Sequence, residues 1–116
     1  MAEFAIVLPF LALLVFAVIQ FGILFNNYIT LTDAVRAGAR KAAVSRHEAN
    51  PAGAAISQTR SSAGDLDQSQ LEVAVSSSWQ PASDVTVSAS YPYSIDLLGL
   101  VVASGRLESR TTERVE

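Results

Sequence analysis

Few side chains of this 116-residue sequence could carry out chemistry, and their spacing assembles no catalytic site. His47 is the only histidine and cysteine is absent, which excludes a histidine-rich metal site, a cysteine–histidine dyad and any disulfide. Asp65, Asp67 and Ser69 alternate as in the opening of a calcium loop. That loop also needs glycine at its sixth place and glutamate at its twelfth, where this sequence has Gln70 and Ser76. We therefore expect no catalytic residue, no metal site and no cofactor.

The charge balance also bears on possible partners. The formal net charge is -3 and the isoelectric point is about 5.0, with the basic residues few and spread out. A protein that binds nucleic acid usually presents a cluster of lysine and arginine to the phosphates. We therefore expect no nucleic-acid partner.

The remaining chemical candidate is Glu3, the one charged residue ahead of a stretch, residues 4–25, that contains no charge at all. A carboxylate at the edge of an apolar helix is costly to desolvate unless it finds a partner, so Glu3 is a functional candidate. The alternative is that Glu3 lies in the headgroup region at a frayed end of the chain.

Residues 4–25 must be positioned as a helix that is buried on every side. At about 1.5 Å per residue they span roughly 30 Å, the thickness of a bilayer's hydrocarbon core. Apolar side chains occupy all faces of the helical projection, which is not typical of an amphipathic helix on a soluble domain. A cleaved signal peptide is the alternative, but the basic leading region and a clear cleavage site are missing.

The helix is predicted to continue well beyond the membrane span. Asn26, Asn27 and Tyr28 are residues typical of a membrane interface, and residues 29–46 are rich in alanine, arginine and lysine without proline. We expect one helix over about residues 2–46, roughly 65 to 70 Å long. Pro9 lacks the backbone donor and predicts a kink or a locally melted turn just before it.

Two sets of side chains on this helix suggest packing against other helices. Ala34, Gly38 and Ala42 lie four apart on one side, a spacing that permits another helix to approach closely. The aromatic residues could be read as a path for electrons, but rings bury large areas in any helix bundle, and packing explains them better. The predicted packing residues are Phe4, Phe10, Phe16, Phe21, Gly22, Phe25, Ala34, Gly38 and Ala42.

The rest of the chain predicts a short helix and a small sheet. Asn50 and Pro51 read as an N-cap and first turn, so we expect a helix over residues 51–62 with Gly64 as terminator. Alternating apolar residues predict strands over residues 71–79, 85–90 and 106–115. Proline in the segment 91–93 should end or bend the second strand. Residues 95–102 are ambiguous between a short helix and an apolar loop.

These elements define an α+β fold: a long N-terminal hydrophobic helix, a second short helix and a small antiparallel sheet of about three strands. The expected organisation has three parts. The long helix occupies residues 1–47, the second helix and its linker residues 48–70, and a small β domain residues 71–116.

Three motifs of the first 40 residues resemble a known family. They are EFAIVLP at residues 3–9, the Phe21-Gly22 pair, and DAVRAGAR at residues 33–40. Together they are similar to the N-terminal half of TadE-like pilins and pseudopilins of the tight-adherence branch of type IV pili. The resemblance covers roughly residues 2–43.

The resemblance implies a structural pilus subunit. A prepilin peptidase would remove a basic leader, and the chain would wait in the bacterial inner membrane until assembly machinery moves it into an extracellular adhesive filament of identical copies. Glu3, in the motif that ends at Pro9, would neutralise the N-terminal ammonium of a neighbouring copy, here on Met1, and so fix the axial register. In many type IV pilins this glutamate is the fifth mature residue, whereas it is the third in this sequence.

Two other classes of function stay open at this point. One is a single-pass membrane protein whose small soluble domain binds a partner in a secretion or assembly complex, and the other is an enzyme. Arg36, Arg40, Lys41 and Arg46 follow the span and by themselves favour a cytoplasmic C-terminal side. Removal of a basic leader would resolve that conflict in favour of a pilin.

Overall fold

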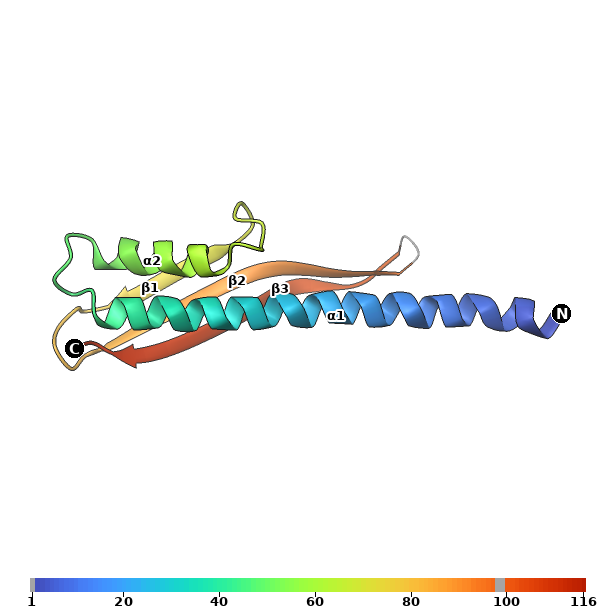
Figure 1. Cartoon of the computed structure of the whole chain (residues 1–116), viewed down its shortest axis with the longest axis horizontal. Coiled ribbons are helices and arrows are strands. Elements are labelled where there is room, and N and C mark those ends of the chain that lie inside the picture. The colour runs from blue at the N-terminus through green and yellow to red at the C-terminus, as the bar shows by residue number, and fades with distance from the viewer. Residues whose placement is uncertain (1, 98–99) are drawn as a thin grey trace.

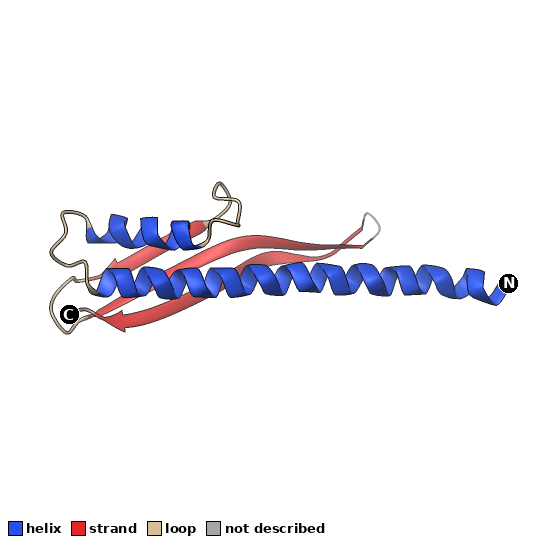
Figure 2. Cartoon of the chain, in the orientation of Figure 1, coloured by secondary structure: helices blue, strands red, loops and turns tan. Residues whose placement is uncertain are grey.

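A computed structural model describes residues 2–97 and 100–116, apart from the side chain of Val102. The described residues form two helices and a three-stranded sheet (Figures 1 and 2). The elements are α1 (Ala2–Ala43), α2 (Pro51–Ser62), β1 (Glu72–Ser77), β2 (Asp84–Leu97) and β3 (Leu100–Arg114). The predicted α+β class, with its long apolar helix, is confirmed. The molecule measures 71 × 23 × 18 Å because α1 extends far beyond the other elements.

Helix α1 ends at Ala43, about three residues before the predicted end. The last turn tightens, since the N–H groups of Val44 and Ser45 donate to the carbonyls three residues earlier. The carbonyl of Ala43 accepts a hydrogen bond from the backbone N–H of Glu116 at 3.0 Å. The chain that follows β3 therefore satisfies one of the carbonyls that a helix leaves unpaired at its C-terminus.

The predicted melting of α1 at Pro9 is wrong. The helix is continuous on both sides of this proline, and Figure 1 shows one uninterrupted element. Proline removes only the hydrogen bond to the carbonyl of Ala5, at a cost of about 3 kcal/mol in a helix interior. The many remaining helical hydrogen bonds of α1 outweigh that single loss.

Helix α2 confirms its predicted bounds. The Asn50 side chain accepts a hydrogen bond from the backbone N–H of Gly53 at 3.1 Å, and Pro51 occupies the first helical position. The helix ends with Ala63 as its C-cap, one residue before the predicted terminator Gly64.

The sheet is antiparallel in the order β1-β2-β3, and its last two strands are longer than predicted. Pro92 neither ends β2 nor leaves a gap in it. Pairing between β1 and β2 stops at Ser90, so around Pro92 only β3 lies beside β2 among the described residues. Proline is tolerated there because one edge of β2 needs no donor.

The segment 95–102 is neither the short helix nor the apolar loop that the sequence left open. Its described residues belong to the ends of β2 and β3, with Leu97 opposite Leu100 and an irregularity at Ile95 and Asp96. The first strand is shorter than predicted, since β1 ends at Ser77 and Trp79 has a positive φ of 58°. The Trp79 N–H donates to the hydroxyl of Ser77 at 3.0 Å, a local turn that competes with strand pairing.

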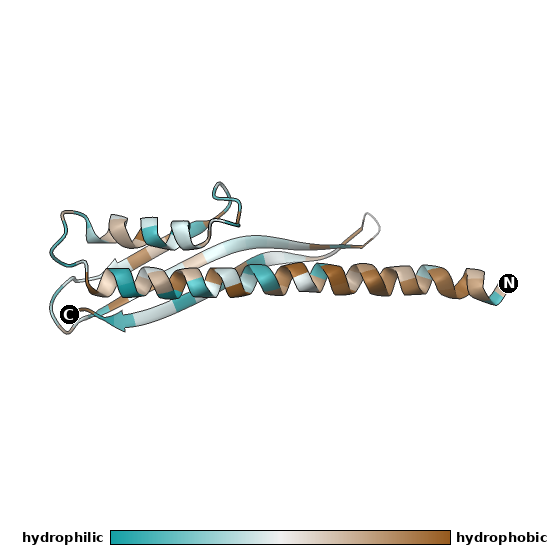
Figure 3. Ribbon diagram, viewed as in Figure 1, coloured by the Kyte–Doolittle hydropathy of each residue, from teal (hydrophilic) through white to brown (hydrophobic). Residues whose placement is uncertain are grey.

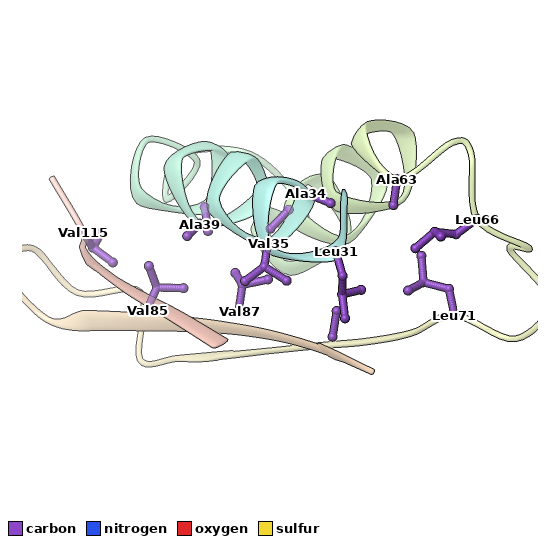
Figure 4. Packing of buried hydrophobic residues seen from close by; sticks show 13 residues of the cluster. Leu31, Ala34, Val35, Ala39, Ala63, Leu66, Leu71, Val85, Val87 and Val115 are labelled. Carbon is purple, nitrogen blue, oxygen red and sulfur yellow. The ribbon is translucent and has the colours of Figure 1, made fainter. Parts of the chain in front are cut away.

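One hydrophobic core joins α1, α2 and the sheet. On β2 the buried residues alternate, so that Val85, Val87 and Ala89 all face the helices. Figure 4 shows Val85 and Val87 on the side of β2 that faces α1, with Val87 next to Val35. The residues of α1 in this core are Leu31, Ala34, Val35, Ala39 and Ala42, all of which lie in its C-terminal part.

Candidate functional site

The N-terminal half of α1 carries the largest apolar surface that the structure describes. Residues 2–11 are all exposed, and residues 12–30 are partly covered along one side only. Figure 3 shows this half of α1 as predominantly hydrophobic, well beyond the core. Among the described residues, α1 is the helix that is long and apolar enough to cross a membrane by length and composition. We treat this surface as the candidate functional site.

The predicted aromatic residues all lie on this surface. Phe4 and Phe10 are 67% and 69% exposed, Phe25 is 64% exposed, and Phe16 and Phe21 are nearly half exposed. Burying one such side chain contributes about 1.5–3 kcal/mol relative to leaving it in water. A contiguous apolar area of this size is rare on a soluble monomer, so lipid or another protein must cover it.

From Ala12 onward α1 has two distinct sides. A stripe of half-buried residues, spaced three or four apart, leads along one side into the buried Leu31. The stripe consists of Leu13, Ala17, Gln20, Leu24 and Asn27. The opposite side, which we call the outward face, consists of Val18, Phe21, Gly22, Phe25 and Ile29, and all of its residues are exposed. At 100° per residue, Val18 and Gln20 point in nearly opposite directions.

The structure places Glu3 in the first turn of α1, where it is exposed. A negative charge at this position interacts favourably with the positive end of the helix dipole. The two ion pairs among the described residues join Lys41 to Glu48 and Arg106 to Glu72, and both lie far along the chain from Glu3. The predicted partner on Met1 lies outside the described residues.

Ala34, Gly38 and Ala42 lie in the core, where a neighbouring helix does approach closely. That helix is α2 of the same chain. A methyl group at Gly38 would lie 1.8 Å from the hydroxyl oxygen of Thr59 and 3.2 Å from the carbonyl oxygen of Ala55. These three small residues are therefore occupied within the fold and present no surface to another molecule.

The acidic segment near Asp67 forms a local turn. One carboxylate oxygen of Asp67 accepts hydrogen bonds from the Ser69 hydroxyl at 2.7 Å and from the Ser69 backbone N–H at 3.0 Å. Both bonds lower the pKa of the Asp67 carboxyl, and the bond from the Ser69 hydroxyl has the larger effect. Within the part of the chain that the structure describes, no three potential metal ligands come together.

Sequence reasoning missed the apolar end of the β2–β3 hairpin. Leu100 and Val101 at the start of β3 are 72% and 63% exposed. The sequence signal for this apolar end was the run of apolar residues in IDLLGLVV, where polar residues no longer alternate with apolar ones. From that run we expected either a short helix or an apolar loop. Gly22 was included among the packing residues, but the open space beside it could not be predicted from sequence. Apart from its two chain neighbours and the backbone of its own helix, no atom lies within 4 Å of the place that a methyl group would take.

Comparison with protein families supports the resemblance found in the motifs. Residues 1–40 match the family model described as TadE-like protein. The matched region covers α1 almost to its end and includes neither α2 nor the sheet. Comparisons with curated proteins and with solved structures gave no match.

Proposed function

We propose that this chain, whose residues 1–40 match the TadE-like family model, is a structural pilin-like subunit that assembles through α1 into an extracellular filament. The match and the exposed apolar half of α1 together fit a pilus-related protein anchored in a membrane. Major and minor subunits of a filament are both included in this proposal.

The observation that carries the proposal is the exposed half of α1. At about 1.5 Å per residue, the 42-residue helix is roughly 63 Å long, twice what a bilayer requires. Side chains on all sides of its first turns need apolar surroundings, and a bundle of parallel copies provides these as well as lipid does. Transfer from lipid into such a bundle therefore keeps the apolar side chains of the first turns of α1 out of water.

Glu3 is proposed to set the register between copies. In a bundle of apolar helices a carboxylate without a partner is penalised by several kcal/mol, whereas one beside an ammonium group is compensated. A copy inserted out of step would lose that compensation. The chain is proposed to reside in the bacterial inner membrane before assembly, to be processed by a prepilin peptidase and handled by the pilus machinery, and to need no enzymatic activity.

The test uses Glu3→Ala and Glu3→Gln in cells that express the full chain. We expect both variants to reach the membrane and to be missing from purified surface filaments, as measured by mass spectrometry. Absence of the unsubstituted chain from every filament fraction would reject the proposal.

The alternative is a single-pass anchor whose sheet binds a partner in a secretion or assembly complex. The observation in its favour is a shallow depression on the exposed face of the sheet, lined in part by Glu72, Ser90 and Arg110. An anchor of that kind would work unchanged with alanine at position 3, so the same variants separate the two functions.

A further inference from the structure

The β2–β3 hairpin carries apolar side chains at its far end, beyond the core. Leu97 of β2 lies opposite Leu100 of β3, and Leu100 and Val101 are 72% and 63% exposed. From Ser104 to Arg114, by contrast, every exposed residue of β3 is polar, charged or glycine. Exposed apolar side chains are therefore concentrated at one end of this strand. We call Leu97, Leu100 and Val101 the hairpin end.

Two hydrogen bonds fix the level of the hairpin along α1. The Ser109 hydroxyl donates to the Thr32 hydroxyl at 3.2 Å, and the Glu116 N–H donates to the Ala43 carbonyl at 3.0 Å. Seven residues at the end of the chain thus run alongside eleven residues of α1. At that ratio, the hairpin end lies beside about residue 18, and a strand parallel to the helix axis would reach about residue 12.

Burial along α1 gives the same level independently. Every described residue before Ala12 is exposed, and half-buried positions begin at Ala12 and Leu13. Figure 1 also shows the ends of β2 and β3 next to the blue, N-terminal part of α1. The hairpin end therefore lies beside residues 12–18 of α1.

The apolar stretch of α1 that fits a membrane extends past this level. Counted from Phe4, directly after the exposed carboxylate of Glu3, about 20 residues are needed to cross a hydrocarbon core of about 30 Å. They end near Ile23, which is at least about five residues beyond the level of the hairpin end. When α1 spans a bilayer, the hairpin end consequently meets the membrane and does not stand clear of it in water.

The backbone and one carboxylate limit how deep the hairpin enters. Beyond Ser90 the described sheet is two-stranded, so both of its edges present backbone groups to the surroundings. Open sheet edges do not occur in hydrocarbon. Asp96, exposed and opposite Val101, adds a charge that is costly there. The headgroup region suits both parts, because apolar side chains reach the acyl chains from it while polar groups still meet water.

The small area of the hairpin end favours lipid over a protein partner. A stable protein contact buries about 800 Å² on each partner, which three side chains cannot supply. The hairpin end lies instead beside the apolar half of α1, the helix that is long and apolar enough to cross a membrane. The lipid that surrounds α1 therefore covers the hairpin end without a further partner.

We infer that the hairpin end is a membrane-contacting element, which enters the headgroup region of the leaflet from which α1 emerges. This second attachment beside α1 holds the sheet at a fixed height and orientation relative to the bilayer. The inference requires α1 in a membrane, which the pilin and the single-pass anchor share, and it requires no filament.

The chain has no cysteine, so one introduced cysteine in the full chain can carry a fluorescent probe. In phosphatidylcholine vesicles at low protein density, we expect nitroxide-labelled lipids to quench a probe on Val101→Cys. The matched control is Glu108→Cys, exposed on the same strand and about 23 Å farther from the hairpin end. Its quenching should be at least about fivefold weaker. Equal quenching at both positions, or none on Val101→Cys in membrane-inserted protein, would overturn the inference.

A second substitution tests the apolar contact itself. Leu100→Glu, combined with the probe on Val101→Cys, changes an exposed side chain, so the fold should persist while quenching falls at least about threefold. Leu100→Met is the matched control and should leave quenching unchanged. Quenching that leucine, methionine and glutamate give equally would overturn the inference.

Two further outcomes separate this inference from other proposals. If Val101→Cys without a probe forms a disulfide-linked homodimer in the same vesicles and the probe is not quenched, a second copy covers the hairpin end and the inference is wrong. Quenching as expected in a chain that is absent from all surface filaments would reject the filament and keep the membrane contact.

Discussion

The tightest contact in the fold, between Gly38 of α1 and Thr59 of α2, leads to a sharp prediction. In Gly38→Ala the new methyl group would lie 1.8 Å from the Thr59 hydroxyl oxygen and 3.1 Å from its β-carbon. That hydroxyl is fully buried and donates to the carbonyl of Ala55 at 2.8 Å. Either the hydroxyl rotates and loses its partner, or α2 moves away from α1.

Loss of the hydrogen bond costs about 1–3 kcal/mol because the hydroxyl stays buried. Overpacking at the contact adds about 1–3 kcal/mol, and the better helix propensity of alanine offsets about 1 kcal/mol. We expect Gly38→Ala to lower the free energy of unfolding by about 3 kcal/mol, a large share of the roughly 5–15 kcal/mol typical of a domain.

Denaturant unfolding of the full chain in detergent measures the effect. The fluorescence of Trp79, the only tryptophan, reports on the core against which it packs. Gly22→Ala is the matched control and should leave stability unchanged or raise it by up to about 1 kcal/mol, since nothing opposes the methyl group there. Thr59→Ala should recover part of the loss in the double variant. Equal unfolding midpoints for the two glycine variants would refute the reasoning.

Two smaller effects follow from local hydrogen bonds. Asn50→Ala should lower the free energy of unfolding by about 1 kcal/mol through loss of the cap on Gly53, while Asn50→Asp, which keeps an acceptor, should restore it; equal stability of all three proteins would contradict the cap. The carboxyl of Asp67 should titrate below its ordinary pKa of 3.8 in an NMR pH series, and Ser69→Ala should move the midpoint upward. Because the folded-state pKa is the lower one, this carboxylate stabilises the turn above its ordinary pKa, and the effect is lost as the pH falls through the folded value. An unchanged titration in Ser69→Ala would show that the hydroxyl is not the cause.

The helices of this fold could be predicted because their signals are local. The uninterrupted apolar run and the cap at Asn50 specify α1 and α2 within a few residues. The lengths of β2 and β3 could not be predicted, because near Pro92 the strands leave the core and the alternation that marks a half-buried strand disappears. Pairing with β3, the next strand along the chain, maintains β2 there.

The candidate site was predictable in composition but not in geometry. Apolar side chains on every face of the helical projection show that residues 4–25 need apolar surroundings on all sides. The pattern is the same whether lipid or protein provides those surroundings. Only the tertiary structure shows that Ala34, Gly38 and Ala42 are buried within the fold, Gly38 against α2, while Gly22 is open. A four-residue spacing of small residues permits close helix packing within one molecule as well as between two, and sequence alone does not distinguish the two cases.

The position of the core at one end of α1 has a mechanical consequence. Residues 31–43 of the helix hold α2 and the sheet, whereas residues 2–11 are exposed on every side. The environment of the first turns can therefore be exchanged completely without disturbing a single interaction that maintains the folded part. A force applied to α2 and the sheet would therefore withdraw the N-terminal half of α1 from its surroundings while the core stays folded.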